Sequence, residues 1–417
     1  MRHRMLALAV PGLFLPSLAF ATNGYISHGI GVRSQGTAGV GYALVQDAFA
    51  AAANPAAIAS SGDRIDLGLS LFRPTRGSRI SGNQAGADGE FSGNGEKNFL
   101  IPEFAYSHQV SPRIGVGLAV YGNGGMNTDY RSNPFGAFGS SGNAGVDLSQ
   151  LFVSPSIAYR LAERHAFGVA LNLAYQRFSA EGLGAFDNPF TSSRPGSVTN
   201  RGTDSATGWG VKLGYLGEIT PELSVGVSWA SEVDAGRFDR YAGLFAEQGG
   251  FDTPSQYGFG FAWKASPALT LAADWQRIEY SDIKSVGNPL ENLFAGNLLG
   301  TDDGGGFGWQ DVSVIKLGIV YRHDERLTLR GGYSRSDQPI PASQTFFNIL
   351  APGVVRDHWS LGASWKLEGG GEWSFSYTRA ARETVRGRNA IPAAFGGGEA
   401  DIHLKEDIFG IAYSWTL

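Results

Sequence analysis

The last nine residues of the chain, 409–417, constrain its fold more than any other feature. Every second side chain from Phe409 to Leu417 is large and apolar, and those between them are Gly, Ala, Ser and Thr. Because successive side chains of a β-strand point to opposite faces, this alternation predicts a strand with one bulky apolar face and one small or polar face. Such a strand is typical of an outer-membrane β-barrel, although here the chain ends two residues beyond its last aromatic residue, Trp415.

The same alternation recurs along the chain after residue 60, for example in residues 65–71, 167–175, 209–215, 257–263 and 315–321. A soluble barrel would turn its bulky face inward and carry charges outside. Here the opposite face is mostly Gly, Ala, Ser and Asn, which favours lipid outside and a polar lumen inside. Eight tryptophans share the apolar parity near strand ends, as an interfacial girdle would: Trp209, Trp229, Trp263, Trp275, Trp359, Trp365, Trp373 and Trp415.

Short and long connections alternate between these segments. The short turns lie at 110–112, 162–164, 220–222, 266–268, 323–325 and 367–371. The long Gly-rich loops lie at about 73–98, 122–152, 179–206, 230–256, 281–311, 335–356 and 379–406. Six turns and seven loops predict an all-β fold, a fourteen-stranded antiparallel transmembrane barrel over residues 61–417, with strands of nine to twelve residues and both ends on the short-turn side.

The first residues have the pattern of a secretory signal peptide, which we assign to residues 1–21. A basic start is followed by an apolar run over 5–18, and Ala19-Phe20-Ala21 forms a small-x-small cleavage site. The alternative is a membrane anchor, but the run is shorter than the roughly 20 residues that a spanning helix needs. Export and the barrel pattern together predict the bacterial outer membrane as the location.

Composition narrows the classes of function. The chain has 417 residues, no cysteine and a net charge of −5, so disulfides and thiolate metal sites are excluded and nothing indicates nucleic acid as a partner. The seven histidines are scattered without ligand spacing, and no metal site is predicted. No Ser/His/Asp arrangement and no phosphate-binding loop is evident. We therefore expect no catalytic residues, no cofactor and no enzyme activity.

Residues 22–60 lack strand periodicity. The segment is Gly-rich up to residue 42, then Ala-rich and helix-prone over 46–53, where Asn54-Pro55 ends it. A plain barrel needs no such prefix. A weakly charged segment of small residues is better explained as a plug inside the lumen than as a solvated tail.

The motifs in this segment resemble the N-terminal hatch of the FadL-type outer-membrane transporters of long-chain fatty acids and aromatic hydrocarbons. They are Asn23-Gly24-Tyr25, the run 36–41, Asp47-Ala48 and Asn54-Pro55-Ala56. The resemblance covers the whole mature chain, because the strand count also agrees. It implies that Asp47, Asn54, Pro55 and Ala56 belong to a hatch.

The resemblance also implies a mechanism. A hydrophobic molecule would be captured outside, pass to a lumenal pocket, and leave sideways at a kinked third strand after the hatch moves. We place that strand at 113–121, followed by the gap candidates Gly122, Gly124 and Gly125. Glycine suits a kink because it leaves space and tolerates unusual backbone angles. Many fatty-acid transporters carry Pro-Phe-Gly here, and this chain does not, which leaves the substrate subclass open.

Two groups of residues are candidates for ligand contact. The long loops carry apolar side chains, which either form a capture groove or bury one another: Phe238, Tyr241, Leu244, Phe245, Leu293 and Phe294. The lumen-facing parity carries the basic candidates Lys212, Lys316 and Arg330, together with Asp66, Glu103 and Asp274. The basic residues either meet a carboxylate ligand or lock the hatch.

We therefore expect a monomer, surrounded by outer-membrane lipid, that takes up hydrophobic small molecules without energy coupling. Long-chain fatty acids are the first candidate, and monoaromatic hydrocarbons are the alternative within the same family. A general porin, an outer-membrane phospholipase and a structural or adhesion barrel remain further alternatives.

Overall fold

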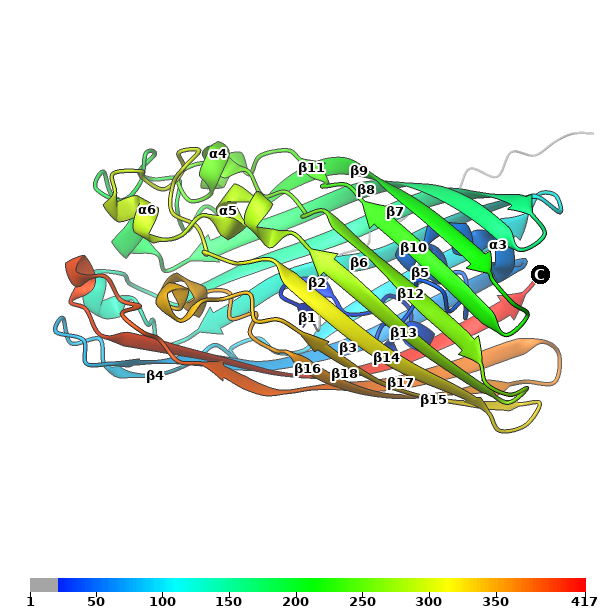
Figure 1. The fold of residues 1–417 in the computed structure, drawn as a ribbon. Helices are drawn as coiled ribbons and strands as arrows, with labels where there is room; N and C mark the ends of the chain where they lie inside the picture. The colour runs from blue at the N-terminus through cyan, green and yellow to red at the C-terminus, as the bar shows by residue number, and fades with distance from the viewer. Residues whose placement is uncertain (1–21) are drawn as a thin grey trace, which may run out of the picture.

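The computed structural model describes residues 22–417, which form a closed antiparallel barrel of 14 strands around a small N-terminal segment (Figure 1). The signal peptide expected at residues 1–21 lies outside the described residues. The barrel strands are β3 (Arg64–Ser81), β5 (Phe99–Gln109), β6 (Ile114–Tyr130), β7 (Ala144–Ala162), β8 (His165–Glu181), β9 (Asp204–Glu218), β10 (Leu223–Ala230), β12 (Gln256–Lys264), β13 (Leu269–Ile278), β14 (Val312–Arg322), β15 (Leu327–Ser336), β16 (Asp357–Lys366), β17 (Gly371–Val385) and β18 (Glu399–Thr416).

Neighbouring barrel strands are also neighbours in the chain, and β18 closes the barrel on β3. That closing ladder runs from Arg64↔Thr416 to Ser81↔Glu399. The six short turns lie where the sequence predicts them, at the end where the C-terminus lies (Figure 1). The prediction of a fourteen-stranded barrel with a hatch in its lumen is confirmed.

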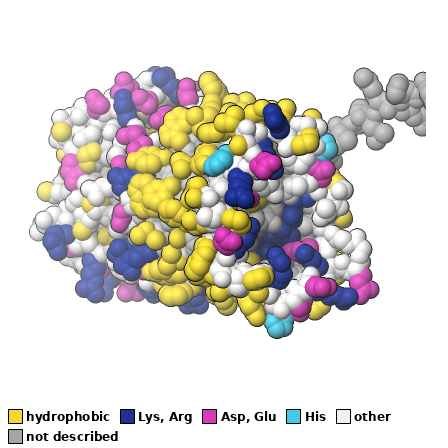
Figure 2. Space-filling model, turned by 45° about the vertical axis from the view of Figure 1, so that its right-hand side comes forward, with side chains coloured by type: hydrophobic (Ala, Val, Ile, Leu, Met, Phe, Trp, Pro, Cys, Tyr) yellow, Lys and Arg dark blue, Asp and Glu magenta, His cyan; other side chains and the backbone are white. Residues whose placement is uncertain are grey.

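The two faces of the wall have the predicted character. Side chains such as Leu171, Phe259 and Ile315 are exposed on the outer face, whereas Asn172, Asp274 and Lys316 are buried toward the lumen. Hydrophobic side chains form a belt across the face of the barrel seen in Figure 2. Because this outer surface is apolar and each barrel strand pairs with both of its neighbours, the wall satisfies the two requirements of a β-structure in a bilayer.

Several strands are longer than the nine to twelve residues predicted. β7 has 19 residues and β8 has 17, whereas β10 has only 8. The long strands continue past the apolar belt toward the long-loop end, where pairing is kept although lipid no longer requires an apolar outer face. Two short strands extend the wall there, β4 (Gly89–Ser92) against β3 and β11 (Asp234–Ala235) against β9.

The long loops contain only short helices and pack against one another over the end of the barrel (Figure 1). The α-helices are α4 (Ala246–Gly249), α5 (Lys284–Gly287) and α6 (Glu291–Phe294), and the 3₁₀ turns are η2 (Gly136–Phe138), η3 (Gly184–Phe186), η4 (Asp239–Tyr241), η5 (Tyr280–Asp282), η6 (Ala342–Gln344), η7 (Phe347–Ile349) and η8 (Ala393–Phe395). None of the helices formed by residues 22–417 has the length and apolar character needed to cross a bilayer.

The hatch segment, residues 22–60, crosses the lumen in a series of short elements. They are β1 (Thr22–Asn23), β2 (Ile26–Ser27), α1 (Val32–Gln35), α2 (Ala50–Ala53), η1 (Pro55–Ala57) and α3 (Ile58–Ser61), which leads into β3. α1 contacts β16, β17 and β18, whereas η1 contacts β7, β8 and β9 on the far side of the barrel. The segment therefore bridges opposite walls.

Candidate functional site: the hatch and the wall that holds it

Carboxylates of the barrel wall accept hydrogen bonds from backbone N–H groups of the hatch segment. Asp274 Oδ2 accepts from Gly41 N at 2.8 Å and from Tyr42 N at 3.1 Å. Two further wall carboxylates do the same, Asp66 Oδ2 from Ala48 N at 2.9 Å and Glu103 Oε1 from Gly31 N at 3.2 Å. Because the segment has little regular structure, its amides need such partners when buried.

The three basic lumen candidates also bind the hatch segment. Lys316 Nζ donates to His28 O at 3.0 Å and to Gly39 O at 3.3 Å, and Lys212 Nζ donates to Ala52 O. Arg330 Nε donates to Gln46 Oε1 at 2.6 Å. All three cations therefore hold the hatch through hydrogen bonds to uncharged oxygens. Of the two roles expected for them, binding a carboxylate ligand or locking the hatch, the structure shows the second.

Asn54 fastens the middle of the hatch segment to the wall. Its Oδ1 accepts from Ala56 N at 3.0 Å and caps η1, while its Nδ2 donates to Tyr42 O at 2.7 Å and to Tyr215 O of β9 at 2.8 Å. Pro55 begins the 3₁₀ turn, where its fixed φ and missing N–H are tolerated. One amide side chain thus joins two parts of the hatch and one strand.

Asp47 is buried beside Asp66 and the guanidinium groups of Arg33, Arg64 and Arg330. Burial raises the pKa of Asp47 to about 6, and the neighbouring Asp66 adds to the shift, while the three arginines act against it. The carboxyl therefore titrates closer to neutral pH than an exposed aspartate does.

Wall glycines allow the hatch to approach the barrel backbone. A Cβ atom at Gly214 would overlap Asn54 Oδ1, and one at Gly168 would overlap the Pro55 carbonyl group. Equivalent overlaps occur between Gly226 and Tyr42 O. Glycine at lumen-facing positions is therefore a packing requirement of the hatch.

The wall is interrupted between β5 and β6. Their pairing runs from Gln109↔Gly115 to Phe104↔Val120 and stops there, although both strands continue. Next along β6, a bulge lies between Gly122 and Gly124. All three gap candidates therefore lie within β6 rather than after the strand, which corrects the predicted end at residue 121. The residues beyond it are polar and Gly-rich, so alternation alone could not extend the strand.

The hatch segment covers this interruption from the lumen side. Ile26 of β2 pairs with Gly124, and Gly125 N donates to Tyr25 O at 3.0 Å. Above it, the Tyr280 hydroxyl accepts from Tyr25 N at 3.3 Å and from Ile26 N at 3.4 Å. The start of the hatch is thus held between the kinked strand and a long loop.

The apolar loop candidates pack into one another. Phe238, Tyr241, Leu244, Phe245 and Leu293 are buried in the large loop cluster, and only Phe294 is exposed, at 44%. Of the two expectations for these residues, a capture groove or mutual packing, the structure shows mutual packing. Phe294 instead contacts Phe395, whose ring also lies 5.4 Å from that of Phe138. Phe138, Phe294 and Phe395, from three different loops, form an accessible aromatic patch.

Arg76 is a site residue that the sequence analysis missed. It is 2% exposed and lies on the lumen side of β3, where it bridges to β6 by donating to the Asn127 carbonyl oxygen at 2.7 Å and to Asn127 Oδ1. A cavity of about 40 Å³ beside it is also lined by Phe72, Met126 and Leu404. The lumen-facing parity of β3 continues through Arg76, but the outward positions 73 and 75 are Arg and Thr, so the apolar alternation ends before this cation is reached.

The barrel has an apolar belt, and charged side chains of its wall hold a hatch inside the lumen. This combination defines an outer-membrane transport protein rather than an enzyme or an open pore. The match to known families agrees: residues 15–416 match the outer membrane protein transport protein family (OMPP1/FadL/TodX), and the chain belongs to it. Members of the family are transporters or channels, and the location in the bacterial outer membrane is confirmed.

Individual relatives are distant in sequence but similar over most of their length. The long-chain fatty acid transport protein of Escherichia coli K12 is 25% identical over 371 residues, covering 80% of this chain and 81% of that protein. Outer membrane protein P1 of Haemophilus influenzae is 24% identical over 304 residues, covering 64% and 63%.

Among solved structures, a Pseudomonas aeruginosa FadL homologue has a TM-score of 0.71 at 15% identity, covering 94% of this chain and 99% of that one. The Pseudomonas putida toluene transporter TodX has a TM-score of 0.69 at 17% identity, with the same coverage. These similarities establish the fold.

Proposed function

We propose that this protein takes up long-chain fatty acids, acting as a monomer. The ligand meets the aromatic patch of Phe138, Phe294 and Phe395, enters the lumen beside Arg76, and leaves sideways into the membrane through the interruption between β5 and β6. The observation that carries the proposal is the coincidence of that interruption with the start of the hatch, where Ile26 pairs with Gly124.

The hatch has to move in this scheme. The cavity beside Arg76 holds about 40 Å³, far less than the several hundred cubic ångströms of most ligand pockets, and Gly24 of the hatch lines it. Withdrawing residues 23–27 enlarges the cavity and uncovers the interruption in one step. Transport is therefore coupled to loss of the contacts that Tyr280 and Gly125 make with Tyr25.

Arg76 supports an acid as the ligand. Its guanidinium group is buried, and in the described residues its hydrogen bonds go to uncharged oxygens. A carboxylate that entered the cavity would offer a charge-assisted, bidentate partner in place of those oxygens. The fatty acid transport proteins among the sequence relatives support the same class.

Binding of oleate and of toluene to the purified protein tests the ligand class. Arg76→Gln should weaken oleate binding at least tenfold and leave toluene binding unchanged, because only the acid needs the cation. Arg194→Gln, an exposed residue of the long-loop end, is the charge-matched control. Tight toluene binding with no oleate binding would instead identify a monoaromatic hydrocarbon channel, the second candidate.

Uptake into cells tests the sideways route. Gly122 shares the outward parity of Val116, so Gly122→Trp would cover the outer mouth of the interruption, whereas Val116→Trp places the same side chain on intact wall. Oleate uptake should fall only in Gly122→Trp, with binding retained in both. Equal uptake would argue against this exit.

Variants of the hatch distinguish a transporter of hydrophobic molecules from a general porin. Substitution of Asn54 and Pro55 should change uptake of hydrophobic molecules, because Asn54 joins the hatch to β9. If small sugars permeate the unaltered protein freely and neither oleate nor toluene binds, the proposed function is wrong.

A further inference from the structure

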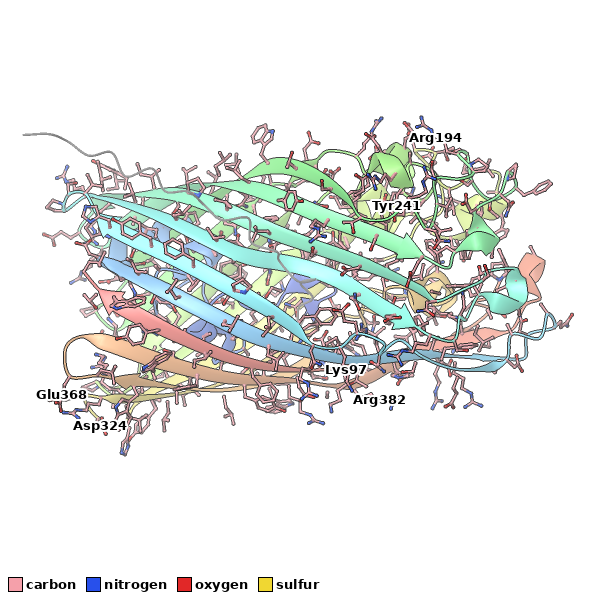
Figure 3. All side chains as sticks on the ribbon, turned by 180° about the vertical axis from the view of Figure 1, so that it is seen from behind. Lys97, Arg194, Tyr241, Asp324, Glu368 and Arg382 are labelled. Carbon is pink, nitrogen blue, oxygen red and sulfur yellow. The ribbon has the colours of Figure 1, made fainter. Side chains whose placement is uncertain are left out.

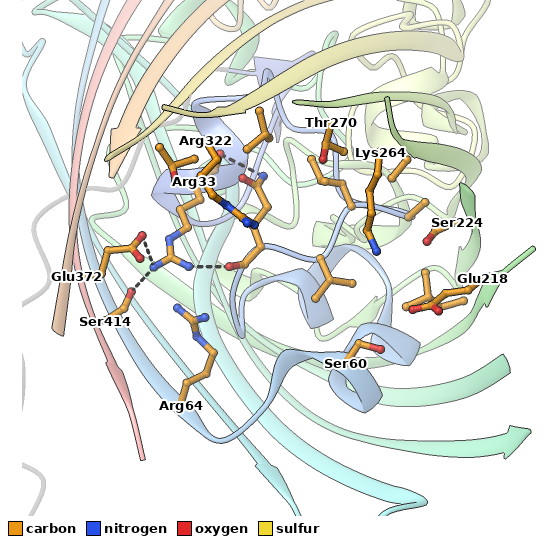
Figure 4. Close-up of a pocket in the computed structure, with 18 of the residues that line it drawn as sticks. Arg33, Ser60, Arg64, Glu218, Ser224, Lys264, Thr270, Arg322, Glu372 and Ser414 are labelled. Carbon is orange, nitrogen blue, oxygen red and sulfur yellow. Dashed lines mark hydrogen bonds and ion pairs between the residues drawn. The ribbon is translucent and has the colours of Figure 1, made fainter. Parts of the chain in front are cut away.

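A large cavity opens at the short-turn end of the barrel, below the hatch. It has a volume of about 740 Å³, and Figure 4 shows hatch and wall side chains around it. Leu44 and Gln46 of the hatch line its inner end, and residues of the turns line its outer end. It lies on the opposite side of the hatch from the loops, and we call it the vestibule.

The lining of the vestibule is strongly basic. It contains eight Lys and Arg side chains but only three Glu, in a chain whose net charge is −5. The basic side chains come from separate parts of the barrel: Lys264 from the end of β12, Arg322 from the end of β14, and Lys366 from the end of β16. On the molecular surface at this end, Lys and Arg side chains are mixed with Asp and Glu side chains (Figure 2).

Most of these cations lack a carboxylate partner. Arg33 pairs with Glu372 at 2.9 Å, and Arg64 pairs with Asp66 at 2.7 Å. Within residues 22–417, the other six make no ion pair: Arg160, Arg164, Lys264, Arg322, Arg330 and Lys366. Glu163 and Glu218 are the remaining acids of the lining.

The unpaired cations make the vestibule attractive to anions. Like charges around a concave, low-dielectric wall reinforce one another, and such a surface raises the local concentration of anions. Figure 4 shows Arg33 and Lys264 on opposite sides of the same space. A volume of about 740 Å³ lies in the usual range for small-molecule sites, so one ligand could contact several of the cations together.

We propose that the vestibule is a binding site for a small organic polyanion, with two or more carboxylate or phosphate groups, that enters from the short-turn end, which is the periplasmic side of an outer-membrane barrel. This site is separate from the path of hydrophobic molecules and does not rest on it. Arg164, Lys264, Arg322 and Lys366, all in the short turns or at the strand ends beside them, hold the ligand. Arg330, which donates to Gln46 of the hatch, lies at the inner end.

A ligand in the vestibule would affect the hatch through the contact between Arg330 and Gln46. Arg330 also donates to Ser364 Oγ at 2.6 Å, so the guanidinium group is shared between hatch and wall. A bound anion competes for it and for Arg33, which donates to Gln46 O at 2.6 Å. Binding therefore changes the protection of residues 44–48 from hydrogen exchange.

Calorimetric titration of the full chain in an uncharged detergent, with citrate and pyrophosphate as probes and acetate as the monoanion, tests the proposal. The polyanions should bind in the unaltered protein and acetate much more weakly, and 0.5 M salt should weaken binding several-fold. The triple variant Arg164→Gln, Arg322→Gln, Lys366→Gln should bind at least tenfold more weakly. Arg194→Gln, at the opposite end of the molecule (Figure 3), should bind as the unaltered protein does.

A charge change of the opposite sign gives an independent test. Glu163→Gln with Glu218→Gln removes two negative charges from the lining, and polyanion binding should become several-fold tighter. This outcome does not depend on the triple variant folding. Absence of citrate and pyrophosphate binding at millimolar concentration, or equal affinity in the unaltered protein and both variants, would overturn the proposal.

Discussion

Lys316 offers the sharpest test of how the wall holds the hatch. The variant Lys316→Met keeps the length of the side chain and removes the ammonium group, which donates to His28 O and Gly39 O in the closed state. Hydrogen bonds from charged donors contribute ~1.5–3 kcal/mol each, and relief from burying the ammonium group offsets part of that. A net loss of about 2 kcal/mol should raise the population of the detached hatch about 30-fold, because each 1.4 kcal/mol is tenfold.

Hydrogen exchange followed by mass spectrometry measures this population. Peptides covering residues 28–41 should exchange about 30-fold faster in Lys316→Met, while peptides from β7 and β8 stay unchanged. Lys97→Met, which changes an exposed lysine in the link before β5 (Figure 3), is the matched control. Unchanged exchange in Lys316→Met would refute the reasoning that wall cations fasten the hatch, and equally fast exchange in the control would show a general effect of charge.

Three further changes probe the same attachment. Because the pKa of Asp47 is raised from 3.8 to about 6, its stabilising form is the protonated one. The hatch should lose stability as pH rises from about 4 to 6, by roughly 2–3 kcal/mol, and Asp47→Asn should flatten this dependence when exchange is measured against pH. Gly214→Ala should destabilise the hatch by ~1–3 kcal/mol, measured as faster exchange of residues 50–61; Gly136→Ala, where a Cβ has open space, should leave it unchanged. Asn54→Ala alone should speed the same exchange. The double variant Asn54→Ala with Gly214→Ala should lose less stability than the two single variants added together, because Asn54 is the group that the new Cβ overlaps. Additive losses would show that the strain lies elsewhere.

Much of the barrel follows from local pattern. The alternation fixes which face meets lipid, and turn chemistry fixes the number of strands, because both depend on residues close together in the chain. The same parity places Asp66, Glu103 and Asp274 on the lumen side, where each binds the hatch. The alternation could not predict which hatch groups these carboxylates bind. Almost every residue has a backbone N–H group, so nothing in the sequence distinguishes the ones that are bound.

The remaining differences arise where contacts are distant in sequence. Strand ends beyond the lipid lose the apolar outer face that marks them, so β7 was predicted too short and Arg76 was assigned to a loop. Apolar loop residues such as Phe238 and Leu293 give the same sequence pattern whether they face solvent or pack against other loops. Only the folded arrangement of several loops shows that they are buried.

The ladder between β18 and β3 has a consequence for assembly. It joins the first and last strands of the barrel, so the wall can close only after the whole chain is present, and the hatch precedes all of it. The hatch is joined to β3 at the short-turn end, so the ladder that completes the cylinder also fixes the point from which the hatch enters the lumen. The C-terminal strand is therefore the part that completes the container of the hatch.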